Sequence, residues 1–135
     1  MQDKFKQGDK ATKIASFSMD DVVKFALLSG DNNPIHLDEN YASKSIFKKP
    51  IVHGILVSGL FSSIIANDLP GQGSIYLHQS LDFKAPVFHN QKIKATVEVL
   101  LVKSEKNIYT LETICSDFDT GKLLIEGKAI VMLKK

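Results

Sequence analysis

The 135-residue sequence has one cysteine, little net charge and no long uninterrupted apolar run. Because Cys115 has no second cysteine to pair with, the chain can form neither an intramolecular disulfide nor a cage of thiolate ligands around a metal. This cysteine usage is typical of the reducing cytoplasm, where we expect the protein to reside. The net charge of +2 comes from lysines spread among acidic residues, which argues against a nucleic-acid partner.

Targeting and membrane-spanning segments are also missing from the pattern. Residues 1–6 lack the apolar core of a signal peptide. The most apolar run, Val52 to Ala66, is interrupted by glycines and serines and falls short of a membrane span. We therefore expect no membrane partner and interpret this run as a helix buried within the protein. Length and composition fit a single globular domain over residues 1–135.

Helical patterns occupy the first half of the chain. Ser18 and Asp21 have the spacing of a capping box, and the helix that follows meets a stop signal at Ser29 and Gly30. The segment 31–34 has turn chemistry, and Asp38 is placed to cap a short helix that runs through Ser43. The run from residue 52 to 67 is apolar or small almost all round, so other elements must enclose it.

Beyond residue 73 the apolar period changes from helical to two. One predicted strand face joins Ile75, Leu77, Leu81 and Phe83, and further strand patterns cover residues 93–99, 108–118 and 123–133. Short turns between neighbouring strands predict an antiparallel sheet with one face exposed to solvent. The predicted fold is α+β, with about five or six strands curled around the apolar helix. The uncovered flank of that helix requires either residues 31–50 or a second chain, and a dimer joined edge to edge would also remove an exposed strand edge.

Asp31 and His36 are the strongest candidates for chemistry, because five residues and a proline-containing turn separate them. Such a turn can bring a carboxylate and an imidazole to one small molecule, and proton transfer to and from water needs this pairing. Histidine titrates near neutrality, and an apolar cleft raises the pKa of a carboxylic acid, so both groups can work at physiological pH. The same residues also have the form of a plain turn and helix cap.

The second candidate is the entrance to the apolar helix, Pro50-Ile51-Val52-His53-Gly54. The first N–H groups of a helix have no internal partner, and the dipole there favours negative charge. Since Gly54 has no side chain, a ligand oxygen could approach its N–H closely, as an oxyanion donor requires. Close packing of helix on sheet is the alternative explanation for this glycine and for Gly59.

Other site types have weaker support. The sequence has no Gly-x-Ser-x-Gly elbow and no glycine-rich phosphate loop or dinucleotide fingerprint. A metal site that uses His36, His53 and a carboxylate stays open, although neither histidine belongs to a recognisable metal-ligand motif. Lysines 44, 48 and 49 could meet the phosphates of coenzyme A, or they could form a solvated loop.

Several separated motifs resemble one known family. Residues 29–36, Ser-Gly-Asp-Asn-Asn-Pro-Ile-His, are similar to the hydratase motif of the MaoC-like, (R)-specific enoyl-CoA hydratases, and residues 50–54 resemble that family's second motif. Residues 73–77 and 83–87 resemble its later strand segments. The similarity runs from about Phe17 to the C-terminus, and the motifs keep their order and spacing.

The resemblance implies a hot-dog fold, in which a sheet wraps a long central helix, and a homodimer with active sites near the subunit interface. It also implies reversible syn hydration of a trans-2-enoyl-CoA thioester to the (R)-3-hydroxyacyl thioester. By position, Asp31 and His36 correspond to the family's catalytic pair and the Gly54 N–H to its oxyanion donor. We add three residues to the oxyanion and substrate-binding set: Asn33, His53 and Ser62.

Five points stay open at this level. The carrier could be coenzyme A or acyl carrier protein, in which case the enzyme would be a 3-hydroxyacyl-[acyl-carrier-protein] dehydratase. A hot-dog thioesterase would need a water aimed at the carbonyl carbon, and a non-catalytic acyl-thioester-binding subunit would be expected to lack Asp31 or His36. Acyl chain length, and whether the product enters polyester synthesis or fatty-acid breakdown, are not readable from the sequence.

Overall fold

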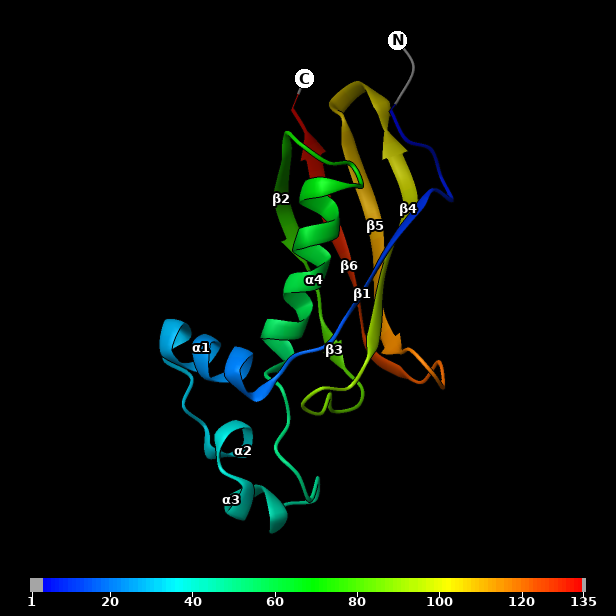
Figure 1. Cartoon of the computed structure of the whole chain (residues 1–135). Coiled ribbons are helices and arrows are strands. Elements are labelled where there is room, and N and C mark those ends of the chain that lie inside the picture. Colours follow the sequence, from blue (N-terminus) through cyan, green and yellow to red (C-terminus); the bar gives the residue numbers. More distant parts are fainter. Residues whose placement is uncertain (1–3, 135) are drawn as a thin grey trace.

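The computed structural model describes residues 4–134, which fold into one sheet, one long helix and a helical arm (Figure 1). The helices are α1 (Met19–Ser29), α2 (Pro34–Leu37), α3 (Glu39–Ser43), α4 (Gly54–Asn67) and the 3-10 turn η1 (Ser104–Lys106). The strands are β1 (Lys10–Ala15), β2 (Ser74–Gln79), β3 (Asp82–Phe83), β4 (Ile93–Lys103), β5 (Ile108–Asp117) and β6 (Leu123–Leu133).

The six strands form one antiparallel sheet in the order β1-β4-β5-β6-β2, and β3 pairs with β6. Figure 1 shows α4 lying lengthwise against one face of this sheet, while α1, α2 and α3 project beyond the N-terminal end of α4. The predicted antiparallel sheet around a single apolar helix is therefore confirmed.

The core lies between α4 and the inner face of the sheet. Strand β4 alternates between buried and more exposed residues as predicted, and β5 does the same, because period-two side chains point to opposite faces. Against these strands α4 packs five side chains that are at most 7% exposed: Val57, Leu60, Phe61, Ile64 and Ile65.

The opposite flank of α4 is uncovered. Ile55, Gly59, Ser62 and Ala66 are all exposed, and their spacing of three or four residues puts them on one stripe of the helix. Residues 31–50 lie past the helix end rather than over this stripe (Figure 1). The sequence left two candidates for covering this flank of α4, residues 31–50 or a second chain, and residues 31–50 do not cover it (Figure 1).

The local helix signals are confirmed. The Ser18 hydroxyl accepts a hydrogen bond from the Asp21 N–H at 3.1 Å, and the Asp21 carboxylate accepts one from the Ser18 N–H at 2.9 Å, which completes the capping box. Gly30 ends α1 in the left-handed region at φ 81°. The Asp38 carboxylate caps α3 by accepting from the Tyr41 N–H at 3.1 Å.

The strand predicted across residues 75–83 is wrong in detail. The chain forms two pieces, β2 and β3, and the register of β2 against β6 shifts between Tyr76 and His78. Residues 75–78 of this edge strand are all exposed, Ile75 and Leu77 at 40% and 51%, so β2 has no buried face that alternates with an exposed one. The sequence pattern also missed β1, an edge strand that is mostly exposed and is fixed by pairing with β4.

Candidate active site at the start of helix α4

The loop that holds Asp31 is organised by short-range hydrogen bonds. The Asp31 N–H donates to the Ser29 hydroxyl at 3.1 Å, and the Asp31 carboxylate accepts from the Asn33 N–H at 3.2 Å. The Asn33 side chain in turn accepts from the Ile35 N–H and caps α2, which begins with Pro34 at its first position. These bonds shape the loop that carries the Asp31 carboxylate.

His36 lies on α2 and is anchored to the segment that leads into α4. Its Nδ1 is 2.8 Å from the carbonyl oxygen of Ile51. A carbonyl oxygen only accepts, so Nδ1 carries the proton and Nε2 keeps a free lone pair. In this tautomer His36 can take a proton from a bound water through Nε2.

The surroundings of His36 favour its neutral form. Burial lowers the pKa of His36 below its ordinary value of 6.5, and the bond to the Ile51 carbonyl opposes this in part. The neighbouring His53 also lowers this pKa, whereas Asp31 raises it. The result is an imidazole that stays unprotonated at neutral pH and is available as a base.

His53, the residue before α4, lies behind His36. Only 2% of His53 is exposed, and its Nε2 is 3.1 Å from the carbonyl oxygen of Asp31, to which it must donate. The two imidazoles are stacked with centroids 3.8 Å apart, and Phe25 packs edge-on against His53. His53 Nδ1 is buried without a hydrogen-bond partner in the described part of the chain.

Helix α4 begins at Gly54 with no side-chain cap on its first turn. Its leading N–H groups are therefore open to a ligand oxygen, and the helix dipole favours negative charge at that end. A Cβ on Gly54 would lie 2.5 Å from Cε1 of Phe83, so the Phe83 ring occupies the space that a side chain at position 54 would need. The surroundings of Gly54 thus support both explanations for this glycine, a free N–H donor for a ligand and close packing of the helix on the sheet.

A cavity of about 380 Å³ opens at this helix start. His36 and Gly54 both line it, together with apolar side chains from the helix entrance and from the loop after β3, among them Phe47, Ile51, Ile55, Phe83 and Val87. Lys84 lies on the cavity wall, with its ammonium 3.7 Å from the Glu126 carboxylate. An apolar cleft with a few polar groups at one end suits a thioester with a hydrocarbon tail.

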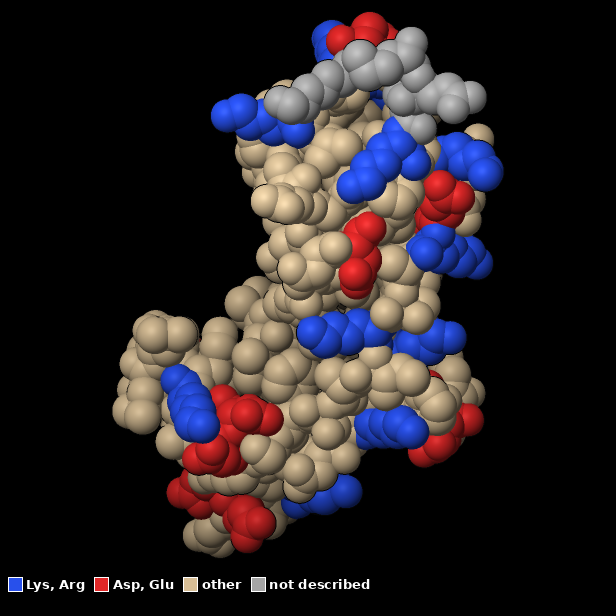
Figure 2. All heavy atoms as spheres, turned by 45° about the horizontal axis from the view of Figure 1, so that its top comes forward, with Lys and Arg blue, Asp and Glu red and all other residues tan. Residues whose placement is uncertain are grey.

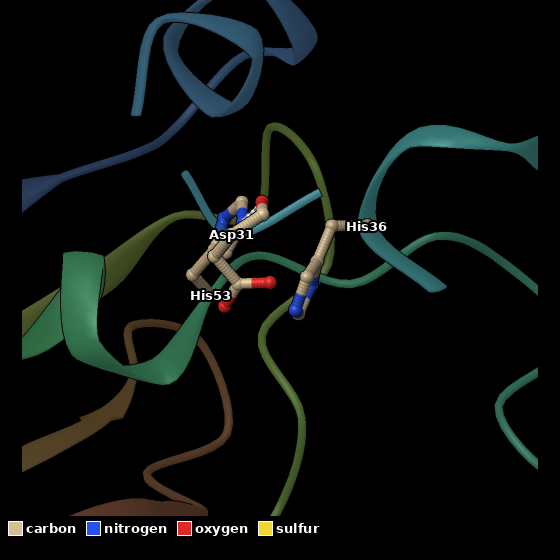
Figure 3. A group of neighbouring side chains, drawn as sticks. All are labelled: Asp31, His36 and His53. Atoms are coloured by element: carbon tan, nitrogen blue, oxygen red, sulfur yellow. Dashed lines mark hydrogen bonds between the residues drawn. The ribbon is translucent and has the colours of Figure 1, made fainter. Parts of the chain in front are cut away.

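The sequence singled out six site residues, and the structure brings four of them together: Gly54 lines the cavity with His36, and Asp31 and His53 lie next to His36. One ligand-type atom from each of Asp31, His36 and His53 lies within 4.8 Å of the others, and Figure 3 shows the Asp31 carboxylate beside the His36 ring. Asn33 caps α2, and Ser62 lies on the exposed stripe of α4 outside the cavity lining. The burial of His53 does not support the direct substrate contact predicted for it.

Two contributors to the site were missed at the level of sequence. The Ile51 carbonyl fixes the tautomer of His36, and the Phe83 ring covers Gly54. A backbone carbonyl leaves no trace in a residue pattern, and Phe83 comes from β3, which approaches α4 only in the folded chain. The family resemblance of residues 83–87 was the one available signal for this loop.

The Asp31, His36 and His53 group could be considered as a metal site. Two histidines that bind one ion direct in-plane lone pairs at it from about 2.0–2.1 Å. The ring planes of His36 and His53 are stacked and only 28° apart, so their lone pairs do not converge on a common point. The arrangement fits an aromatic stack better than a ligand set.

The one cysteine of the sequence, Cys115, is not available to this site as a nucleophile. Cys115 lies on β5 in the core, and burial raises the pKa of its thiol to about 12. A thiol in that state is not an activated nucleophile. The site therefore supports proton transfer and water addition rather than covalent catalysis through cysteine.

Residues 2–116 match the family model described as the MaoC like domain. The chain belongs to the MaoC-like domain family. The (R)-specific enoyl-CoA hydratase of Aeromonas caviae is 45% identical over 126 residues, which cover 93% of this chain and 93% of that protein. The solved (R)-hydratase from A. caviae involved in PHA biosynthesis matches with a TM-score of 0.94 at 43% identity, covering 98% and 100% of the two chains.

Another relative has a different acyl carrier in its name. The mitochondrial 3-hydroxyacyl-[acyl-carrier-protein] dehydratase of Arabidopsis thaliana is 35% identical over 130 residues, which cover 95% of this chain and 77% of that protein. The structural match confirms the hot-dog fold that the motifs implied.

Proposed function

We propose that this protein is an (R)-specific enoyl-CoA hydratase, a hydro-lyase that adds water reversibly to trans-2-enoyl-CoA and forms (R)-3-hydroxyacyl-CoA. The observation that carries the proposal is that His36 lines the 380 Å³ cavity together with Gly54, while a carboxylate oxygen of Asp31 lies within 4.8 Å of a ring nitrogen of His36. The identity to the A. caviae hydratase over nearly the whole chain supports the same reaction.

The helix start supplies activation of the alkene in this mechanism. The thioester carbonyl accepts a hydrogen bond from the Gly54 N–H, at a helix end that favours negative charge. As water adds to the β-carbon, electron density moves onto this carbonyl oxygen. A preorganised donor therefore binds the transition state more tightly than the ground state.

Asp31 and His36 handle the water. His36 Nε2 accepts one proton as the water oxygen bonds to the β-carbon, and the Asp31 carboxylate accepts a hydrogen bond from the other O–H. The imidazolium then returns the proton to the α-carbon on the same face as the enolate collapses. One water is consumed, one C=C bond becomes single, and His36 ends in its starting tautomer.

The decisive experiment uses crotonyl-CoA and the purified protein. Hydration removes the enoyl conjugation and its ultraviolet absorbance without releasing a thiol, and chiral analysis is expected to give the (R)-alcohol. Release of free thiol with no loss of the alkene would mean a thioesterase and would overturn the proposal. Tight binding of crotonyl-CoA without turnover would indicate the non-catalytic subunit.

A second candidate has a specific observation in its favour, the identity to the acyl-carrier-protein dehydratase of A. thaliana. The reaction at the double bond is the same, and only the carrier of the acyl group differs. Comparing kcat/KM for crotonyl groups on coenzyme A and on acyl carrier protein separates the two. Higher kcat/KM for the coenzyme A thioester is the expected result.

We also propose that the protein is a homodimer. The stripe of α4 at Ile55, Gly59, Ser62 and Ala66 is exposed, and β2 is an unpaired sheet edge beside it with Tyr76 and Leu77 39% and 51% exposed. A second copy that paired at β2 would complete the sheet and cover the stripe, since unpaired edges and apolar stripes both favour association. Ser62 would then lie near the substrate at the interface.

The remaining expectations follow the same proposal. We expect residues 1–135 to act as one domain in the cytoplasm, without metal, cofactor, membrane or nucleic-acid partner. No helix within residues 4–134 is long and apolar enough to cross a membrane. On the face drawn in Figure 2, lysine and acidic side chains are interspersed, which gives no support to a nucleic-acid site.

A further inference from the structure

His53 is the most buried polar side chain near the cavity, and the reaction described above does not use it. Only 2% of its surface is exposed, and the cavity lining does not include it. Its contacts are instead with the two groups that handle the water: its Nε2 donates to the Asp31 carbonyl, and its ring is stacked on His36.

The imidazole at this position is not explained by packing. His53 Nδ1 is buried and has no hydrogen-bond partner among residues 4–134. A buried unsatisfied nitrogen costs about 1–3 kcal/mol, and an apolar side chain of similar shape would avoid this cost. A phenylalanine could keep both ring contacts, with His36 and with Phe25. What only the histidine supplies is the N–H that reaches the Asp31 carbonyl.

That hydrogen bond joins parts of the chain that local structure does not connect. It links Asp31, in the loop after α1, to the residue that begins α4, 22 positions later. The short-range bonds to Ser29 and Asn33 shape the Asp31 loop but do not tie it to the start of α4. Asp31 itself is exposed, so core packing does not hold it in position.

We propose that His53 is a positioning residue whose N–H fixes the Asp31 carboxylate relative to His36 and to the Gly54 N–H. This inference rests on the proposed hydratase function. The His53 N–H holds the Asp31 backbone at the helix start, and the His53 ring packs against His36 as a contact that another side chain can replace. A displacement of about 1 Å in such a group can reduce turnover about 10²-fold.

Three variants separate the hydrogen bond from the ring. His53→Gln keeps an N–H donor without the ring, His53→Met matches its length without the donor, and His53→Phe keeps the ring without the donor. We expect H53Q to retain most of the wild-type kcat for crotonyl-CoA hydration. H53M and H53F should lose about 10²-fold in kcat with KM changed less than about threefold, because the cavity wall is intact. H53F should unfold at a temperature no lower than that of the wild type.

Equal kcat values for H53Q and H53M would overturn the inference, and this comparison does not depend on whether H53F folds. A substrate-independent measurement distinguishes its failure from that of the proposed function. In protein labelled with ¹⁵N-histidine, NMR should show the Nε2–H tautomer for His53 and the Nδ1–H tautomer for His36. An inactive wild type with these tautomers would reject the hydratase and keep the geometry, whereas the opposite His53 tautomer would reject the positioning role.

Discussion

The imidazole rings of His36 and His53 are stacked, with centroids 3.8 Å apart and planes 28° from parallel. One ring faces the cavity and is anchored to the Ile51 carbonyl, while the other is buried and holds the Asp31 carbonyl. The stack therefore connects the proposed proton acceptor, His36, to the loop that carries the Asp31 carboxylate.

Replacing either water-handling side chain should remove most of the activity. We expect Asp31→Asn and His36→Ala to lower kcat for crotonyl-CoA hydration by about 10²–10⁴-fold, because general acid–base groups contribute that much. Both side chains are at least partly exposed, so circular dichroism and the melting temperature should change little. Near wild-type turnover in either variant would be incompatible with the proposed mechanism.

The Gly54 N–H can be tested without changing any other polar group. Proline is tolerated at the first position of a helix and lacks the N–H, and His53 already has φ −56° and ψ 124°, which suit a residue before proline. Gly54→Ala is the matched control, since it retains the N–H while its Cβ also meets Phe83.

We expect G54P to have about 10²–10³-fold lower kcat than G54A, the effect of losing one oxyanion donor. The difference is to be measured by steady-state hydration of crotonyl-CoA after thermal melts show that both variants fold. Equal kcat values for the two would mean that this N–H does not contact the thioester.

Activity and stability should both fall at acidic pH. Burial lowers the pKa of His36, and it does the same for His89, which is also near the site. The kcat/KM profile should therefore keep its plateau down to a pH below 6.5 before His36 is protonated. In the unfolded chain these histidines bind protons near pH 6.5, earlier than in the folded chain, so the free energy of unfolding should decrease as pH falls through that value.

Urea unfolding at pH 7.5 and at pH 5.5 measures the second effect. His36→Gln should show a smaller decrease in the free energy of unfolding between the two values than the wild type does. An acidic limb of kcat/KM centred above pH 6.5 would contradict the environment described for His36.

Removal of metal ions should leave turnover unchanged. The stacked geometry of His36 and His53 does not direct two lone pairs at one ion, and the mechanism routes its protons through side chains alone. Dialysis against EDTA, followed by hydration assays in metal-free buffer, checks this. Loss of activity that zinc restores would instead indicate that Asp31, His36 and His53 act as ligands.

A charge on the open stripe of α4 should dissociate the dimer. Gly59→Glu introduces a carboxylate there without harming the helix, since glutamate has the higher helix propensity. Sedimentation should give a dimer for the wild type and a monomer for G59E, with Lys94→Glu, a charge change at an exposed position of β4, as the control. A G59E dimer would show that the stripe is not the interface.

The helix boundaries were predictable because their signals are local. The capping box of Ser18 and Asp21 and the Asp38 cap each depend on residues within one turn of the chain. The strand after residue 73 was predicted with a buried face that β2 lacks, because its place at the edge of the sheet is set by its pairing with β6. The mostly exposed β1 has no strong pattern of its own and exists through β4.

The sequence likewise predicted the residues of the candidate site but not the contacts between them. Asp31 and His36 were found because one short motif holds both, and Gly54 because it opens an unusually apolar run. Their relation to each other depends on hydrogen bonds between residues 15 and 22 positions apart, from His36 to Ile51 and from His53 to Asp31. No spacing rule anticipates such bonds.

The amino-acid sequence by itself determined the family motifs, the helix caps and the need to enclose an apolar helix, since each follows from neighbouring residues or from composition. Tertiary structure alone decided the tautomer of His36, the burial of His53 and which stripe of α4 stays open. The physical reason is that these properties are set by contacts across the closed sheet and loops. Such contacts exist only once distant segments have been brought together.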